Sequence, residues 1–217
     1  MTSAPENGRS EDESLLVQAV RRRTGDRVAA AEAEVRRLLD VGLELMTEAP
    51  ESTPKVADIV RRAGVSNDAF YRAFGGKAEL MAAIADDGAR RLIGYVRHQR
   101  DKATSPREQL VASVRAVLAQ AMNPQVAATT RAVLRNAAQL SRPGSAAHPA
   151  VRDRYAQLLV EPLRRLSSLD PERDSRVVAN GSFAFMEQSL WSERELDEGD
   201  VDHLVQFLLR GAGVPET

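Results

Sequence analysis

Apolar residues recur with the 3.6-residue period of an α-helix in one segment after another, and this periodicity restricts what the chain can fold into. Three of these segments open on a helix-capping residue followed by proline, a pattern typical of a helix start. The pairs are Ser105-Pro106, Asn123-Pro124 and Asp170-Pro171. No alternating strand pattern extends beyond a few residues. The sequence therefore predicts an all-α protein.

The periods and stop signals also predict the limits of the helices. Residues 1–13 are polar and small, and we expect a disordered tail there. Gly25 is expected to interrupt the chain between a short amphipathic stretch and the first long helix, and Pro162 to kink a later helix. We expect helices over about 26–47, 77–102, 105–122, 123–140, 150–169, 170–192 and 201–210, with a pair of short helices inside 56–74.

Composition excludes several classes of protein. Cysteine is absent, which rules out disulfides, thiol catalysis and thiolate metal sites and is compatible with the cytoplasm. No apolar run approaches the ~20 residues of a membrane span, and the N-terminus has no signal-peptide core. We therefore expect a cytoplasmic protein that does not enter a membrane.

Positive charge is local and not general, because the net charge is −1. Residues 61–77 carry Arg61, Arg62, Arg72 and Lys77 against the single Asp68. A second basic cluster, Arg21-Arg22-Arg23 with Arg27, precedes the first long helix. If nucleic acid is the partner, these two clusters have to attract it.

The stretch VADIVRRAGVSNDAFYRAF, residues 56–74, has two apolar helical stripes around the break Gly64-Val65-Ser66. Two helices joined by a short turn with glycine describe a helix-turn-helix, in which Gly64 permits the sharp turn and Ser66 caps the second helix. An ordinary helical hairpin in an all-α core would give the same pattern. The second helix, however, is short, its outer face is polar and aromatic, and a lysine follows it. These features favour DNA binding.

The segment KVADIVRRAGVSNDAFYRAFGGKAELMAAI resembles the DNA-binding segment of the tetracycline-repressor (TetR) family of transcriptional regulators. The likeness extends over about residues 28–84. It implies that the start of the second short helix contacts bases, and that Tyr71 and Lys77 contact phosphates. Ala73 departs from the family, which often has histidine there, and Asp68 is either a base contact or a helix cap. The expected DNA-binding residues are Lys55, Ser66, Asn67, Asp68, Ala69, Tyr71, Arg72 and Lys77.

The resemblance also implies a domain organisation and partners. We expect a flexible, partly basic arm over residues 1–25, a three-helix DNA-binding domain over 26–80, and a larger helical domain for dimerisation and ligand binding over 81–217. The arm is expected to contact DNA, although a solvated charge run is an equal alternative. The last two helices are expected to form a homodimer through apolar residues that one helix pair cannot bury alone. These are Phe183, Met186, Leu190, Leu204, Val205 and Leu208.

A small-molecule cavity in the larger domain is a further implication of the resemblance. We expect it among the helices of residues 105–192, opened by the kink at Pro162. Few charges fall on the inward faces of these helices, so a neutral or apolar effector is expected. A fully packed core is the alternative. The expected effector-binding residues are Gln139, Tyr155, Phe183, Met186 and Gln188.

No pattern in the sequence predicts catalysis, a cofactor or a metal. Gly75-Gly76-Lys77 lacks the upstream glycine, the Ser or Thr and the preceding strand of a nucleotide-binding loop. His98, His148 and His203 have no partner at metal-ligand spacing. The sequence thus predicts a regulator, most simply a repressor released from a palindromic DNA operator by a small molecule, with activation left open. The alternative is an all-α enzyme or adaptor in which the 56–74 hairpin is structural.

Overall fold

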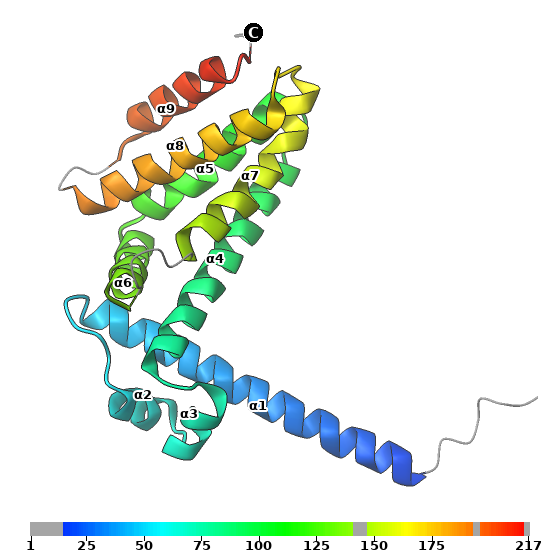
Figure 1. The fold of residues 1–217 in the computed structure, drawn as a ribbon, viewed down its shortest axis with the longest axis vertical. Coiled ribbons are helices and arrows are strands. Elements are labelled where there is room, and N and C mark those ends of the chain that lie inside the picture. Colours follow the sequence, from blue (N-terminus) through cyan, green and yellow to red (C-terminus); the bar gives the residue numbers. More distant parts are fainter. Residues whose placement is uncertain (1–14, 141–146, 193–195, 215–217) are drawn as a thin grey trace, which may run out of the picture.

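The computed structural model describes residues 15–140, 147–192 and 196–214, and every regular element in these ranges is a helix (Figure 1). The prediction of an all-α fold is confirmed. The helices are α1 (Leu15–Glu48), α2 (Val56–Ala63), α3 (Asn67–Ala73), α4 (Lys77–Asp101), α5 (Pro106–Met122), α6 (Pro124–Leu140), α7 (Ala147–Arg165), α8 (Pro171–Trp191) and α9 (Glu198–Gly211).

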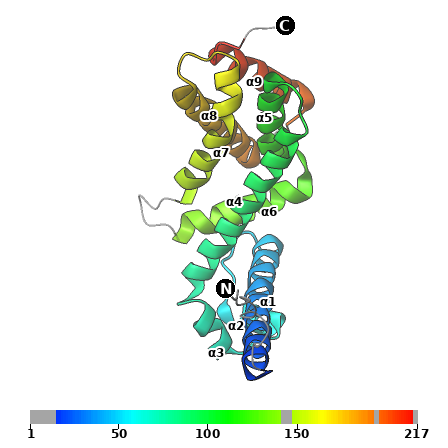
Figure 2. The ribbon, with the colours of Figure 1, turned by 90° about the vertical axis from the view of Figure 1, so that its right-hand side faces the viewer.

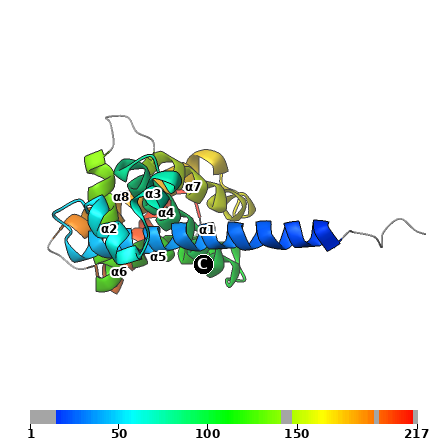
Figure 3. The same ribbon diagram turned by 90° about the horizontal axis from the view of Figure 1, so that it is seen from below.

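Helix α1 corrects one predicted boundary. The helix begins at Leu15 and continues through Gly25, so the arm expected over residues 1–25 is helical from Leu15 onward. A glycine inside a helix costs only about 1 kcal/mol relative to alanine, and the residues around Gly25 include several good helix formers. The N-terminal part of α1 extends beyond the other helices (Figure 3). The tail predicted over residues 1–13 lies outside the described residues.

Caps explain where the later helices start and stop. Helix α5 starts after Ser105, as the sequence predicts, and the Ser105 hydroxyl and the Glu108 carboxylate form a capping box there. Helix α9 starts earlier than expected, because Asp197 and Asp200 in the acidic loop form a second capping box. Helix α7 ends earlier than expected, at Arg165, and Pro162 lies in its last turn and not in its middle.

One hydrophobic core joins α1, α2, α3 and the start of α4, with one residue from α6. Gly42 allows α1 and α4 to approach closely, since a Cβ at this position would lie 2.6 Å from the Cδ1 atom of Ile84. Figure 2 shows the two short helices of this core, α2 and α3, at one end of the molecule. The buried residues of this core are Leu38, Leu39, Met46, Ile59, Val60, Ala63, Phe70, Phe74, Leu80, Met81, Ile84 and Ala132.

A second core joins the C-terminal part of α4 with α5, α7, α8 and α9. Helix α4 contributes to both cores, through Leu80 and Ile84 in the first and Ile93 and Val96 in the second. Helix α6 also has one buried residue in each core, so α4 and α6 together connect the α1–α3 unit to the larger helical unit.

The apolar residues predicted to form a dimer interface are buried inside the chain. Phe183, Met186 and Leu190 on α8 are at most 4% exposed, and the three positions predicted on α9 are also buried. The prediction was wrong because it counted only two helices, whereas α5 and α7 also pack against α8 and α5 also packs against α9. The three buried residues of α9 are Leu204, Val205 and Leu208.

Candidate nucleic-acid interface

The turn between α2 and α3 has the geometry predicted from the sequence. Gly64 has a left-handed backbone conformation, φ 66°, at the end of α2, which residues other than glycine rarely adopt. The Ser66 hydroxyl accepts a hydrogen bond of 3.1 Å from the backbone N–H of Ala69, and so caps α3. Two local contacts thus fix the direction in which α3 leaves the turn.

Helix α3 buries one face and presents the other to solvent. Phe70 is fully buried, and its ring packs against those of Tyr71 and Phe74 with centroid distances of 5.2 and 5.9 Å. Tyr71 itself is 58% exposed. The exposed face of α3 and its cap consists of Ser66, Asn67, Asp68, Tyr71 and Arg72.

Ala69 was also expected among the base-contacting residues, and the structure corrects this expectation. Its side chain is 4% exposed and faces the core beside Phe70. The reason is the helical period, because Ala69, Phe70 and Ala73 follow one another on the buried side of α3. The exposed side chains at the start of the helix are those of Asn67 and Asp68.

Three cations flank α3 without a described carboxylate partner. Lys55 is exposed at the start of α2, Arg72 is exposed on α3, and Lys77 is the first residue of α4 and half-buried. Arg61 and Arg62, in contrast, are occupied by carboxylates of their own domain. The positive charge available to a polyanion is therefore centred on Lys55, Arg72 and Lys77.

The ion pairs of α2 fix this helix to α1. Arg62 donates hydrogen bonds of 2.6 and 2.7 Å to the two carboxylate oxygens of Glu48. The hydrogen bond from Arg62 lowers the pKa of Glu48 below its ordinary value. Arg61 pairs with Asp58 on its own helix at 2.6 Å. The Arg62–Glu48 pair joins two different helices, so local sequence spacing does not reveal it.

A second basic region lies on the N-terminal part of α1. Arg22, Arg23 and Arg27 are exposed on this helix, while the side chain of Arg21 lies outside the described residues. Figures 1 and 2 show the N-terminal end of α1 and helix α3 at the same end of the molecule, opposite α9. The part of α1 that carries these arginines thus lies at the same end of the molecule as α3.

A cavity of about 630 Å³ lies between α1, α4, α6, α7 and α8. Two of the predicted effector residues, Phe183 and Met186, line it. Tyr155 does not: it is fully buried in the second core, and burial raises the pKa of its hydroxyl. Gln188 is exposed to solvent, and the side chain of Gln139 lies outside the described residues.

The cavity lies closer to the α1–α3 unit than predicted, and Pro162 does not line it. Few inward charges were expected on the helices of residues 105–192, and only Arg154 and Glu187 of these helices line the cavity; its other charged residues lie on α1 and α4, which the prediction did not include. Asp86 and Arg90 lie four residues apart in the sequence, as do Asp87 and Arg91. This spacing usually indicates ion pairs on a solvated helix face, so it does not by itself indicate a cavity wall. The charged residues on the cavity wall are Asp40, Asp86, Asp87, Arg91, Arg154 and Glu187.

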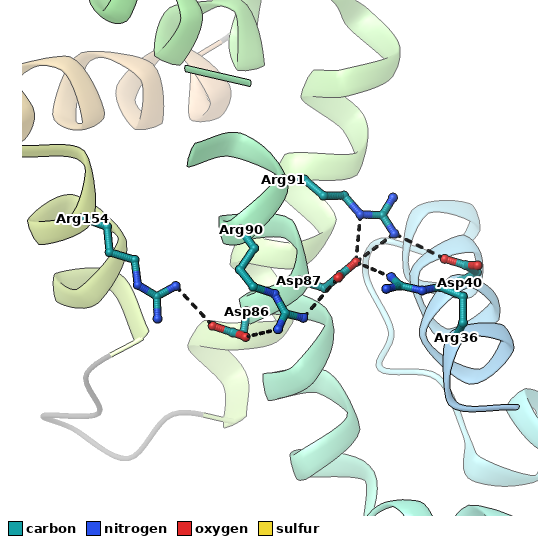
Figure 4. Close-up of polar contacts among 7 residues, drawn as sticks. All are labelled: Arg36, Asp40, Asp86, Asp87, Arg90, Arg91 and Arg154. Carbon is teal, nitrogen blue, oxygen red and sulfur yellow. Dashed lines mark hydrogen bonds and ion pairs between the residues drawn. The ribbon is translucent and has the colours of Figure 1, made fainter. Parts of the chain in front are cut away.

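All of these residues except Glu187 belong to one continuous network, which joins α1, α4 and α7 (Figure 4). The Asp87 carboxylate on α4 accepts hydrogen bonds from Arg36 on α1 at 3.0 Å and from Arg91 at 2.8 Å. Arg91 also lies 3.6 Å from Asp40 on α1. On the other side, Arg154 on α7 lies 3.6 Å from Asp86. The network thus connects the wall of the cavity to the first helix of the helix-turn-helix unit.

Within the described ranges, no group of His, Asp or Glu side chains has an arrangement that fits a metal ion. None of the helices in those ranges is both long and apolar enough to span a bilayer.

The sequence profile of the family described as "Bacterial regulatory proteins, tetR family" matches residues 38–84. This segment runs from α1 through the helix-turn-helix into α4. Among curated proteins there is no significant match.

Solved structures share the fold over most of the chain. RolR in complex with the ligand resorcinol is 17% identical, with 86% of this chain and 91% of that chain covered and a TM-score of 0.60. A TetR-family transcriptional regulator from Pectobacterium atrosepticum is 19% identical, covering 85% and 93%, with a TM-score of 0.61. The superantigen PfiT is 18% identical, covering 82% and 95%, with a TM-score of 0.61.

At these identities the solved structures establish a shared fold, and a fold by itself does not determine a function. The profile match is of a different kind, because it depends on the residues of the helix-turn-helix itself. Residues 38–84, which contain the helix-turn-helix, therefore match the tetR family of bacterial regulatory proteins, and most of the chain shares its fold with solved structures that include a TetR-family regulator.

Proposed function

We propose that this protein is a transcriptional repressor that binds a palindromic DNA operator as a homodimer and leaves it when a small molecule enters the cavity. The observation that carries the proposal is the division of α3 into two faces. Phe70 and Phe74 anchor the helix in a core, while Asn67 and Tyr71 remain exposed. A hairpin serving only as a core element would have no need of such a face.

The exposed face suits the major groove of DNA. The side-chain amide of Asn67 can make a bidentate contact with adenine, and Asp68 can accept a hydrogen bond from the amino group of cytosine. Tyr71, Lys55 and Lys77 lie around them and are suited to phosphate oxygens, which fix the position of a protein on the duplex. Base-reading and phosphate-binding groups are thus combined on one surface.

Exposed apolar residues on α8 and α9 support a homodimer. Val177, Ala184 and Trp191 recur every seven residues on the outer side of α8, and Val177 and Trp191 are 60% and 50% exposed. Phe207 on α9 is 63% exposed. Pairing of this surface with its copy would bury all four residues and produce a two-fold assembly. Such a dimer presents two α3 helices to half-sites about 34 Å apart.

The cavity supports regulation by a small molecule. Its volume of about 630 Å³ falls within the range of ligand pockets, and it lies at the junction of the two cores. RolR, which shares the fold, has resorcinol as a ligand. An effector releases DNA only if it binds the DNA-incompetent conformation more tightly than the competent one.

Selection of duplexes from a random pool with the purified full-length protein tests the proposal. We expect enrichment of a palindromic sequence with two half-sites about one helical turn apart. Enrichment of no sequence above a pool carried through without protein would contradict it. In that case the alternative, a helical protein in which the hairpin is structural, would be preferred.

A further inference from the structure

The cavity wall combines a large apolar surface with charged residues from α1, α4, α7 and α8. Leu43, Leu92, Val133 and Phe183 belong to the apolar part. Figure 4 shows most of the charged residues where α4 faces α1 and α7. A ligand that fills this cavity therefore meets ionised groups, and their pairing determines which ligand charge is favourable.

Two of the carboxylates on the wall are firmly held by arginines. Asp87 lies 2.8 Å from Arg91, 3.0 Å from Arg36 and 3.2 Å from Arg90. Glu187 accepts hydrogen bonds of 2.8 and 2.9 Å from Arg152. A cationic ligand would have to compete with arginines already in hydrogen-bonding contact with these groups.

Arg154 on α7 is bound much less firmly. Its described ion pair is with Asp86, at 3.6 Å, which is too long for a direct hydrogen bond. Asp86 is shared with Arg90, which lies 3.5 Å away, and the side chains of Arg154 and Asp86 are 49% and 50% exposed. The guanidinium of Arg154 is thus the cation on the wall whose hydrogen-bonding capacity is least used.

The charge balance of the wall points to the same residue. The ionised wall residues and their ion-pair partners include one more arginine than carboxylates, so one added anion would neutralise the group. The arginines are Arg36, Arg90, Arg91, Arg152 and Arg154, and the carboxylates are Asp40, Asp86, Asp87 and Glu187.

We propose that the cavity binds an apolar molecule with a single anionic group, such as a carboxylate, and that this group pairs with Arg154 in place of Asp86. The inference rests on the proposed function, because it names the chemical class of the effector. The planar guanidinium can hold a carboxylate through two parallel hydrogen bonds, which the present contact with Asp86 does not provide. The apolar body of the ligand lies against the remaining wall.

The network gives this binding event a route to the DNA-binding domain. Once Arg154 pairs with the ligand, Asp86 keeps only Arg90 among its described partners, and Arg90 is drawn away from Asp87. Asp87 is the residue that holds α1 through Arg36. Binding of an anion thus changes the contacts between α4 and α1, the first helix of the helix-turn-helix unit.

Matched pairs of ligands test the inference with the full-length protein. We choose decanoate with 1-decanol and 2-naphthoate with 2-naphthol, so that each pair shares a body and differs in charge at neutral pH. Binding is measured by isothermal titration calorimetry, and DNA release by fluorescence anisotropy of the selected duplex. We expect the carboxylate of at least one pair to bind about tenfold more tightly than its neutral counterpart and to release the duplex.

Two variants with opposite expected effects identify the residue. Arg154→Gln should lower the affinity for the carboxylate about tenfold and leave the affinity for the alcohol unchanged. Asp86→Asn should raise carboxylate affinity, since it removes the competitor for Arg154. Arg164→Gln on the same helix is the control, because Arg164 pairs with Glu161 and Glu172 and does not line the cavity. A purely structural role of Arg154 cannot give opposite signs at the two positions.

The inference is overturned if no carboxylate binds more tightly than its neutral partner, including the case in which none of the four molecules binds. It is also overturned if Arg154→Gln weakens both members of a pair equally. Binding of the selected duplex without ligand is measured in parallel. If the duplex binds and the carboxylates fail, only the effector class is wrong, whereas failure to bind any duplex contradicts the proposed function itself.

Discussion

Arg36 donates a hydrogen bond of 3.0 Å to Asp87 across a separation of 51 residues, and this contact joins the first helix of the DNA-binding unit to α4. Asp87 is 9% exposed and also contacts Arg90 and Arg91. Burial opposes ionisation of Asp87, but the hydrogen bonds and charges of Arg36 and Arg91 outweigh it and lower its pKa. Asp87 is therefore ionised in the folded protein and lies at the centre of the contacts between α1 and α4.

Replacement of Asp87 by Asn should lower the free energy of unfolding by about 1–3 kcal/mol at neutral pH, because it leaves the neighbouring arginines without their carboxylate. The effect should depend on pH. A carboxyl whose pKa is lower in the folded than in the unfolded state stabilises above its unfolded pKa of about 3.9, and loses this contribution as the pH falls through the folded pKa. Urea denaturation of both proteins over a pH series measures the difference.

The control for this variant is Asp86→Asn, in which the carboxylate is half exposed and its ion pairs are longer. We expect a change within about 0.5 kcal/mol. Equal destabilisation by the two substitutions would show that the position of the charge in the network does not matter.

The cap of α3 is open to an independent test. Ser66→Ala removes the acceptor for the Ala69 N–H and should lower the free energy of unfolding by about 1 kcal/mol. It should also weaken DNA binding, since the start of α3 carries the residues proposed to contact bases. Ser66→Asp keeps an acceptor and should retain most of the stability. An alanine variant as stable as the parent would indicate that the cap does not hold the helix.

The dimer surface predicts the effect of charges on α8 and α9. Val177→Glu combined with Phe207→Glu should convert the proposed dimer to a monomer, because ionised groups are unfavourable in a buried apolar interface. Light scattering at micromolar concentration gives the mass. Leu169→Glu is the matched control, since Leu169 is fully exposed in the segment between α7 and α8. A parent protein that is already monomeric would reject the interface.

The basic residues of α1 should contribute to the affinity for DNA but not to the preference for a particular DNA sequence. We expect joint replacement of Arg22, Arg23 and Arg27 by Gln to weaken binding to all duplexes and to flatten the dependence on salt, because contacts with phosphates release counterions. The half-site preference set by Asn67 should stay the same. Unchanged affinity for DNA at low salt would indicate that these arginines are only solvated charges on the helix surface.

Local signals were sufficient for much of the fold. The Gly64 turn, the Ser66 cap and the stripe of Phe70 and Phe74 depend on residues close in sequence, and the structure has them as predicted. The prediction of a break at Gly25 was wrong, because a single glycine is too weak a signal to end a long helix. The family motif places Ala69 among the base-contacting positions, whereas the helical period places it on the buried side of α3, as the structure has it.

The cavity and its network depend on contacts that the sequence does not reveal. Arg36 and Asp87 meet only because α1 and α4 cross closely at Gly42. The apolar residues of α8 and α9 are similarly ambiguous, since the same period fits a core and a dimer interface. Only the packing of α5 and α7 against α8 assigns Phe183 and Met186 to the interior of the chain.

The most direct test of the central claim is the affinity of the selected duplex as a function of salt concentration for the parent, Lys77→Ala and Asn67→Ala. The account predicts that Lys77→Ala weakens binding to every sequence and reduces the salt slope by about one unit. It predicts that Asn67→Ala keeps the slope and loses about 1–3 kcal/mol of discrimination at one position per half-site. Lys102→Ala, at the other end of α4, should behave as the parent. Parental affinity, slope and preference in both variants would contradict DNA recognition by this face of α3.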